Sequence, residues 1–445
     1  MPRLGEFVFA PTTEREVAYL IGAQLPGRAP QPVEDQMLEL TELVETAGAE
    51  VVGSDVQHLE RPNPAFCYGK GKVQELRRLR GSFGFTTLVS NEDLTPRQQR
   101  NLEDALDMKV LDRREVILDI FARHARTHEG RLQVEAAQLH HLLPRLAGGR
   151  NLSRLGGGIG TRGPGEQKLE VDRRRIRQRI RELQRDIEKV RRARRLHRAA
   201  RRRSSMPVVA IVGYTNAGKS TLLNALTGAD AIVADQMFAT LDPTTRAARL
   251  ADGRQVLLTD TVGFIQKLPT ELIAAFRATL EELTEADIVM HVLDISRPGM
   301  HERFTATNVV LDELQTLDKP LVLALNKRDL LPSSTVERLV RRGDWSPYEE
   351  AVAVSARTAQ GLDSLRGALQ RLTESGLVRL QLLLPYDRAG LESELRQRGR
   401  VLAREYVAEG IRLAVDVPEE ESHRFQEFAL PTPTPRRRPT AQRSA

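Results

Sequence analysis

The stretch "IVGYTNAGKS", residues 211 to 220, decides how this chain folds. The end of an apolar strand runs into Gly213, and the stretch closes on Gly218, Lys219 and Ser220, where the helical pattern "STLLNALTG" begins. Glycines at these two positions let backbone amides close around a phosphate chain at the start of a helix. The stretch therefore predicts a phosphate-binding loop between a buried strand and a helix, within an α/β nucleotide-binding domain.

The chemistry of this loop assigns roles to its residues. Lys219 is expected to reach the β- and γ-phosphates, and the Ser220 hydroxyl is expected to bind Mg²⁺. A chance glycine turn is the alternative, but it does not account for the strand and the helix on either side. The loop residues expected at the nucleotide are Gly213, Tyr214, Thr215, Asn216, Ala217, Gly218, Lys219, Ser220 and Thr221.

The tetrapeptide "NKRD", residues 326 to 329, selects the base, because it closes the apolar strand "LVLAL". The Asp329 carboxylate can accept hydrogen bonds from both N1–H and the exocyclic amine of guanine, and adenine offers no such pair. Polar sites of this kind discriminate by on the order of 10⁴. A solvated turn is the alternative for a lone tetrapeptide. The residues expected on the base side are Asn326, Lys327, Arg328 and Asp329, with "SAR" (Ser355, Ala356 and Arg357) supplying an amide for guanine O6.

Two further segments would sense the γ-phosphate. "DTVG" contains Asp260, Thr261, Val262 and Gly263; Asp260 would hold Mg²⁺ through a water, and the Gly263 amide would contact the γ-phosphate. The segment "FATLDPTTR", residues 238 to 246, must supply a switch threonine, and Thr240, Thr244 and Thr245 all compete for that role. The contacts expected from this segment are Phe238, Ala239, Thr240, Leu241 and Asp242.

Strand and helix patterns alternate on both sides of a different middle region. Residues 112 to 147 carry a heptad seam of Leu118, Phe121, Ala125, His128, Leu132, Ala136, Leu139, Leu143 and Leu146. A second seam follows a glycine-rich loop and contains Leu169, Ile176, Ile180, Leu183, Ile187 and Val190. Two heptad seams joined by a loop predict an antiparallel helical hairpin, a coiled coil.

The predicted fold class is therefore a multidomain α/β protein whose nucleotide-binding domain has a mostly parallel sheet. Its parts are an N-terminal α/β domain at 1–111, a helical hairpin at 112–205 with a glycine-rich loop at 148–165, a nucleotide-binding domain at 206–374, a small C-terminal α+β domain at 375–424, and a disordered basic tail at 425–445.

Charge and cysteine content narrow the function classes. The net charge is +7, but residues 173 to 203 carry 15 Arg and one Lys against three acidic residues, a net of +13, so the rest of the chain sums to −6. This local excess indicates a polyanion partner, and a solvated coiled-coil face is the weaker alternative. A single cysteine, no apolar run long enough to cross a bilayer and no secretory leader predict a cytoplasmic protein.

Taken together, these motifs resemble the HflX family of translation-factor-related GTPases. The resemblance rests on "GYTNAGKS", "FATLDPTTR", "DTVGF", "NKRD", "SAR", "YGKGKV" at 68 to 73 and "GGGIGTRGPGE" at 156 to 166, and it reaches to about residue 420. It implies GTP and GDP as ligands, Mg²⁺ held by Ser220 and Thr240, and Thr240 as the switch threonine. "GEQKLE" departs from the family's usual Gly-Glu-Thr-Gln-Leu-Glu, and the basic tail lies outside the resemblance.

The site lacks the glutamine that orients the attacking water in Ras-like enzymes, because Phe264 follows Gly263. No residue is therefore assigned as certainly catalytic; Thr240 and Gly263 are switch residues. A partner or a cation must complete the site. Related GTPases with Asn at the position of Asn216 hold K⁺, and a loop-bracing amide is the equal alternative.

The family implies the large ribosomal subunit as partner, with the glycine-rich loop reaching the peptidyl-transferase region through Arg150, Arg154 and Arg162. The first interpretation is a monomeric, cytoplasmic GTPase, with at most weak membrane association, that splits or rescues ribosomes under stress. The alternatives are a ribosome-assembly or RNA-modification GTPase and a nucleotide-regulated adaptor. "GKGK", 69 to 72, is either a second, adenine-nucleotide site or a basic turn that opens a helix.

Overall fold

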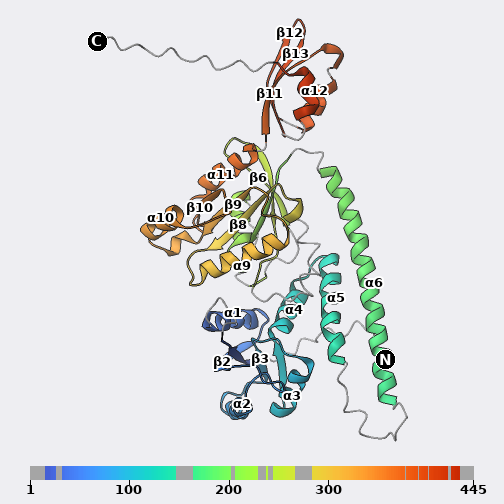
Figure 1. Cartoon of the computed structure of the whole chain (residues 1–445), viewed down its shortest axis with the longest axis vertical. Coiled ribbons are helices and arrows are strands. Elements are labelled where there is room, and N and C mark those ends of the chain that lie inside the picture. Colours follow the sequence, from blue (N-terminus) through green and yellow to red (C-terminus); the bar gives the residue numbers. More distant parts are fainter. Residues whose placement is uncertain are drawn as a thin grey trace.

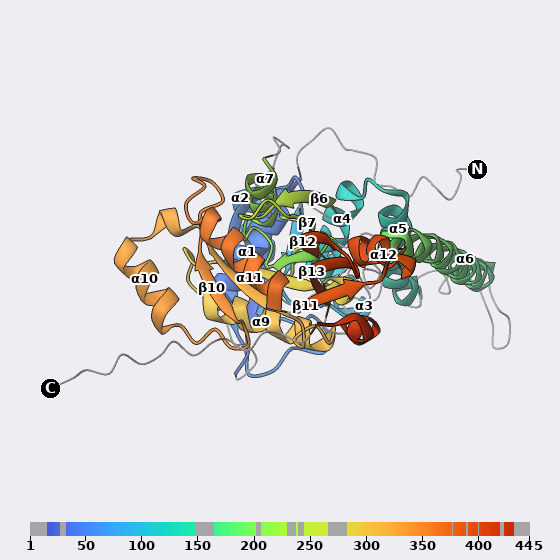
Figure 2. The same ribbon diagram turned by 90° about the horizontal axis from the view of Figure 1, so that it is seen from above.

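The computed structural model describes residues 16–26, 33–146, 164–201, 206–228, 237–238, 244–265, 283–375, 377–388, 390–398, 400–418 and 422–430. Within these ranges the chain forms three sheets, stacked along the long axis of the molecule, with the long helix α6 (Pro164–Arg201) beside the lower two (Figure 1). Seen from above, α6 lies at the edge of the molecule (Figure 2). No helix among the described residues combines the length and apolar character needed to cross a membrane.

The N-terminal sheet is wholly parallel, in the order β2-β1-β3-β4. Helices α1 and α4 cover one face and α2 and α3 the other, so the residues of β1 are almost all buried. Capping boxes begin two of these helices, Thr95 with Gln98 at α3 and Asp112 with Glu115 at α4. The elements are β1 (Val17–Gln24), α1 (Val33–Thr46), β2 (Glu50–His58), α2 (Lys70–Phe83), β3 (Thr87–Ser90), α3 (Pro96–Leu106), β4 (Lys109–Asp112) and α4 (Arg113–His124).

The second sheet has six strands in the order β10-β9-β8-β5-β7-β6, all parallel except the edge strand β6. Every residue of β8 and β9 is buried, as expected for a sheet covered on both faces. The elements are β5 (Val208–Gly213), α7 (Lys219–Thr227), β6 (Thr244–Arg249), β7 (Gln255–Asp260), β8 (Ile288–Asp294), α9 (Met300–Glu313), β9 (Leu321–Asn326), the 3-10 helix η3 (Arg328–Leu330), α10 (Ser333–Arg342), β10 (Glu350–Ala353) and α11 (Leu362–Ser375).

The two sheets share one hydrophobic core. Buried side chains of β1, α1 and α4 belong to the same cluster as those of β5, α7 and β7. At the boundary the rings of Phe121 and Phe238 lie 4.5 Å apart. The N-terminal sheet is therefore packed directly against the domain that carries the phosphate-binding loop.

The prediction of one helical arm across residues 112 to 147 is wrong. The helix breaks after α4 and restarts as α5 (His128–Arg145), because Ala125 is extended and the Thr127 side chain caps Gly130 N–H at 3.0 Å. Leu118, Phe121 and Ala125 pack in the shared core, and only the later seam residues face α6.

Helices α5 and α6 pack side by side through a small apolar cluster of Leu132, Ala136 and Leu183 (Figure 1). The Arg179 guanidinium of α6 binds the Glu135 carboxylate of α5 at 2.8 and 3.0 Å. Pro144 lies inside α5, and Arg145 then reaches back to Asp112 of the N-terminal domain at 3.2 Å. The predicted loop at 148–165 lies outside the described residues except for its last two, which begin α6.

The third sheet is antiparallel, in the order β11-β13-β12, and has its own core. One prediction needs correction here. The structured part of this unit extends past residue 424, since Phe425 is buried and Ala429 pairs with Leu382. The elements are β11 (Leu377–Leu384), η4 (Tyr386–Arg388), α12 (Gly390–Arg398), β12 (Arg400–Val407), β13 (Gly410–Pro418) and η5 (His423–Phe428).

A buried histidine makes the stability of the second domain dependent on pH. His291 of β8 is fully buried, and its Nδ1 lies 2.6 Å from the Tyr348 hydroxyl, which donates to Asn308 Oδ1. Burial, helped by the nearby Lys219, lowers the pKa of His291 to about 3 from the ordinary 6.5. In the unfolded chain the His291 imidazole therefore becomes protonated below about pH 6.5, whereas in the folded domain it stays neutral down to about pH 3.

We expect this domain to lose stability as the pH falls from 6.5 towards 3, by up to about 1.4 kcal/mol per pH unit from His291. His291→Gln should lose less over the same range, because the amide does not titrate. Urea unfolding followed through Trp345, the chain's one tryptophan and a neighbour of Phe304 in that core, measures the difference. Parallel pH profiles for the two proteins would contradict the assignment.

Candidate nucleotide site

The phosphate-binding loop joins β5 to α7, and two of its glycines are required by its shape. Gly213 has φ +145°, and a Cβ there would lie 2.2 Å from the Val292 carbonyl oxygen. Gly218 has φ +90°, and its Cβ would lie 2.4 Å from Asn326 Nδ2. Side chains at these two positions would break the packing of the loop on β8 and β9, so the loop can close only with glycine.

Lys219 and Ser220 lie where the loop enters α7. Lys219 Nζ is buried and donates to the Tyr214 carbonyl oxygen at 2.8 Å, and burial lowers the pKa of Lys219 to about 8 despite the nearby Asp260. The Ser220 hydroxyl donates to Asp260 Oδ2 at 2.7 Å. A hydroxyl and a carboxylate side by side are hard oxygen ligands, so these residues fit Mg²⁺.

The segments "NKRD" and "SAR" meet at the loop through Asn326. Its Nδ2 donates to the Ala217 carbonyl oxygen at 2.8 Å, and its Oδ1 accepts from Ala356 N–H at 3.0 Å. Lys327 has φ +66° and binds Asp294 at 2.8 Å. Asp329 is exposed in η3, and Ser355 Oγ accepts from Thr358 N–H. The structure therefore brings the three segments to one edge of the sheet, with the Asp329 carboxylate open to solvent.

The residues after Asp260 lie against the loop. Phe264 N–H donates to Gly213 O at 3.0 Å, and Thr215 N–H donates to Phe264 O at 2.8 Å. The Phe264 ring is buried with Leu283 and Leu311 behind the sheet, so it cannot orient a water at the phosphates. A Cβ on Gly263 would lie 2.9 Å from Lys219 Nζ, which places this glycine beside the lysine.

The structure describes two of the three candidate switch threonines. Thr244 and Thr245 lie in the edge strand β6, a strand the sequence patterns did not predict, and the Thr245 hydroxyl lies 3.0 Å from that of Thr259. Thr240 lies outside the described residues, as do Ala239, Leu241 and Asp242. Phe238 packs against Phe121 of α4, so its predicted contact with the nucleotide stays a prediction.

The N-terminal domain contributes a contact that the motifs did not reveal. The Tyr214 hydroxyl donates to Glu39 Oε1 of α1 at 2.8 Å, across 175 residues of sequence. No local pattern marks Glu39, because its partner lies in another domain. In "GKGK", Lys72 binds Asp55 and Glu75, which favours the basic turn that opens α2.

Comparison with known proteins places these features in one family. Residues 34–122 match a family described as "GTP-binding GTPase N-terminal", residues 124–201 one described as "GTP-binding GTPase Middle Region", and residues 208–327 one described as "50S ribosome-binding GTPase". "GTPase HflX" of Caldanaerobacter subterraneus subsp. tengcongensis is 46% identical over 89% of this chain and 91% of its own. "GTPase HflX" of Escherichia coli is 42% identical over 82% and 85%.

A solved structure is also similar. It is a GTP-binding protein of Sulfolobus solfataricus in complex with GDP, 26% identical over 81% of this chain and 99% of its own. The TM-score is 0.43, too low for a comparison of how the domains are arranged.

Asn326 should matter for both folding and nucleotide affinity. Asn326→Ala leaves Ala217 C=O and Ala356 N–H without the side chain that joins them. We expect a loss of about 1–3 kcal/mol in the free energy of unfolding and weaker binding of GDP, that is, a higher Kd. Asn308→Ala is the control, because it removes a hydrogen bond to Tyr348 in the core behind β8. This control should lower stability without changing GDP affinity. Equal GDP affinity in the two variants would contradict the bracing role of Asn326.

Proposed function

Because the chain belongs to the HflX family of GTPases, we propose that it binds the large (50S) ribosomal subunit and splits or rescues stalled and idle ribosomes under stress. It is a GTPase, which hydrolyses GTP to GDP and phosphate. The observation that carries the ribosomal part of the proposal is an exposed row of arginines on α6.

This arginine stripe consists of Arg174, Arg177, Arg181 and Arg185, at helical spacings of three and four residues. All four side chains are exposed, and none pairs with an acidic group among the described residues. The buried seam of α6, which includes Ile180 and Leu183, occupies the opposite face. Four unpaired cations within three helical turns repel one another, and an RNA backbone would relieve that repulsion.

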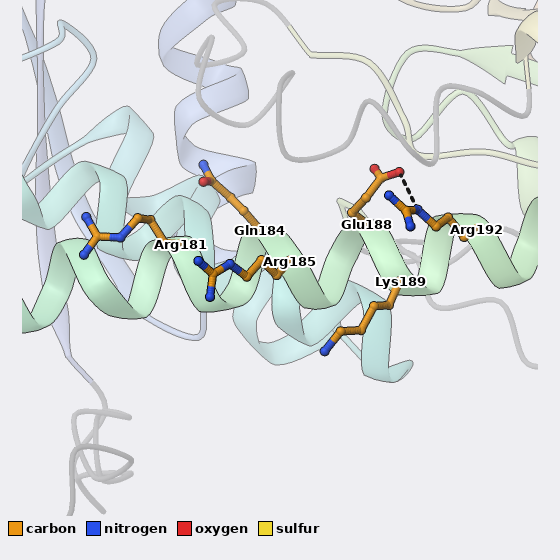
Figure 3. A pocket seen from close by; sticks show the side chains of 6 residues that line it. All are labelled: Arg181, Gln184, Arg185, Glu188, Lys189 and Arg192. Atoms are coloured by element: carbon orange, nitrogen blue, oxygen red, sulfur yellow. Dashed lines mark ion pairs between the residues drawn. The ribbon is translucent and has the colours of Figure 1, made fainter.

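A shallow hollow extends the stripe towards the end of α6. It is lined by Arg181, Gln184, Arg185, Glu188, Lys189 and Arg192 (Figure 3). Here two cations are already neutralised, since Arg192 lies 3.6 Å from Glu188 and Lys189 lies 2.8 Å from Asp186. Arg181 and Arg185 are then the cations of the hollow best placed for phosphates.

The catalytic half of the proposal concerns the ions. Ser220 and Thr240 would hold Mg²⁺ directly, and Asp260 through a water, so that the metal offsets charge on the β- and γ-phosphates. Asn216 is half-buried at φ +59°, and its amide forms no hydrogen bond with the described residues. That amide is our candidate ligand for K⁺.

The partner would supply the function that Phe264 cannot perform, which is to orient the attacking water. With its ring in the core, basal hydrolysis should be slow, roughly 10⁻⁴ to 10⁻³ s⁻¹, as for Ras alone. An activator that places Thr240 and Gly263 at the phosphates can raise the rate up to about 10⁵-fold. The subunit is proposed as that activator.

Turnover measured with GTP in K⁺ or Na⁺, each with and without large subunits, tests this function. We expect a slow basal rate, a faster rate in K⁺ and a much faster rate with large subunits. Deleting residues 148 to 165 should reduce the subunit effect and spare the K⁺ effect, because Asn216 lies in the GTPase domain.

Other outcomes of the same assay decide between functions. Preference for precursor particles or naked RNA would replace ribosome splitting with assembly or RNA modification. The adaptor needs a separate binding measurement, in which salt-insensitive binding to a protein partner would favour it. Equal rates in the two cations would remove Asn216 from the mechanism, and a fast basal rate unchanged by subunits would contradict a partner-completed site.

Changing the arginine stripe to glutamine should weaken binding to large subunits and flatten its salt dependence. Each lost phosphate contact lowers the slope of log K against log salt by roughly 0.7 to 0.9. Arg179→Gln is the matched control, because Arg179 is committed to Glu135 of α5. It should leave the slope unchanged, and so would the stripe variant if the stripe were only a solvated face.

A further inference from the structure

The carboxyl ends of β8 and β9 lie side by side at the edge of the sheet where the base-binding segment "NKRD" begins. Asp294, the last residue of β8, pairs in register with Asn326, the last residue of β9. Ile295 N–H then donates to the Asn326 carbonyl oxygen at 3.2 Å, so the two chains stay together one residue past the strands. This pairing brings the Asp294 side chain to Lys327, the second residue of the motif.

The backbone of Lys327 is in a conformation that a lysine seldom adopts. Its φ is +66° and its ψ is +32°, in the left-handed region, where a residue with a side chain is strained. This conformation turns the chain out of β9 and into η3, which carries Asp329. A residue keeps such a conformation only where the surrounding structure holds it, and strain of this kind is most frequent at functional sites.

The Asp294 carboxylate supplies part of that hold. Lys327 Nζ binds Asp294 Oδ2 at 2.8 Å, and the two side chains are 25% and 7% exposed. Asp294 Oδ1 accepts from the backbone N–H and the hydroxyl of Ser296 at 2.9 and 2.6 Å. The two bonds from Ser296 orient the carboxylate so that Oδ2 is presented to Lys327. Since the pair is largely buried, salt screens it less than it screens a surface ion pair.

Arg297 is a second cation near this carboxylate, but its guanidinium is bound elsewhere. Its Nε lies 4.0 Å from Asp294 Oδ2, whereas its Nη1 lies 2.6 Å from Glu42 of α1. The distance of 2.8 Å from Lys327 Nζ to the same Asp294 oxygen is much shorter. The charge of Asp294 therefore acts mainly on Lys327.

We propose that Asp294 is a positioning residue for guanine nucleotide binding, and that it acts through Lys327. By binding the ammonium group, Asp294 fixes the Lys327 side chain on the base side of the site and offsets the strain of its backbone. The segment is then already in its binding conformation when nucleotide arrives, and such preorganisation raises affinity. This inference rests on the GTPase site of the proposed function but not on its ribosomal partner.

The test measures the Kd of the full chain for fluorescent mant-GDP without ribosomes. Asp294→Asn keeps the size of the side chain and an oxygen for Ser296, but it removes the charge that binds Lys327. We expect binding to weaken by roughly three- to tenfold, less than the full value of a hydrogen bond to a charged group, because Asp294 acts indirectly. In a chain that already carries Lys327→Met, the same change should have little further effect, since the ammonium group is gone.

Two neighbouring residues provide matched controls. Ser296→Ala removes the hydroxyl that donates to Asp294 and leaves the pair with Lys327 in place. Arg297→Gln removes the ion pair with Glu42 and the more distant of the two cations. Both variants should bind mant-GDP like the unaltered chain.

Inosine diphosphate separates the action of Asp294 from that of Asp329. Hypoxanthine lacks the exocyclic amine of guanine, so the preference for GDP over inosine diphosphate reports the base contact expected from Asp329. We measure that preference by competition against mant-GDP. It should be the same in the unaltered chain and in Asp294→Asn, because the change releases Lys327 and leaves the carboxylate of Asp329 in place.

Several results would overturn the inference. Unchanged mant-GDP affinity in Asp294→Asn would do so, as would an undiminished effect of that change in the Lys327→Met chain. An equal loss in Ser296→Ala would assign Asp294 a role in the turn alone, and a lost preference for GDP would assign it to the whole segment.

Thermal unfolding shows which variants are folded, and Asp294→Ser replaces Asp294→Asn if the latter is not. Binding of mant-GDP by the unaltered chain tests the GTPase site itself, so its failure is distinct from a failure of the Asp294 inference. No ribosome is present, and the ribosomal part of the proposed function therefore has no bearing on the result.

Discussion

The packing of helix α1 between two domains is the constraint on which most of this structure depends. Its apolar face, with Met37 and Leu40, is buried in the core shared by both sheets. The residues Glu39, Glu42 and Thr46, spaced by three and four, instead contact the GTPase domain. One amphipathic helix thus fixes the N-terminal sheet to the domain that binds nucleotide. Its apolar contacts stabilise the interface, and its polar contacts fix the relative position of the two domains.

The sequence predicted best what is determined locally. The phosphate-binding loop, the "NKRD" strand end and the parallel strands of the first two sheets follow from glycine geometry and from runs of apolar residues. The helix break at Ala125 escaped prediction, because the heptad spacing continues through it while Thr127 caps a new helix. Strand β6 was not predicted either, because "TTRAAR" lacks the apolar residues typical of a buried strand. It lies at the edge of the sheet and pairs only with β7. Glu39 could not be assigned, because its role depends on Tyr214 in another domain.

The apolar and the charged residues of α6 lie on opposite faces of the helix. One face contributes Ile176, Ile180 and Leu183 to the packing, and the opposite face carries the arginine stripe. Arg179 lies between the two and joins α6 to Glu135 of α5. The helix can therefore remain fixed to the body of the protein by one side while the other side stays available to a polyanion.

The division of the cores has an evolutionary consequence. The C-terminal sheet buries Leu382, Leu413 and Phe425 among its own residues, so substitutions there are accommodated within that unit. The N-terminal and GTPase domains meet at the ring pair of Phe121 and Phe238, where a change of volume on one side requires compensation on the other. Selection on these two domains is accordingly joint. The C-terminal unit is free to diverge, or to be exchanged by recombination, without remodelling the nucleotide site.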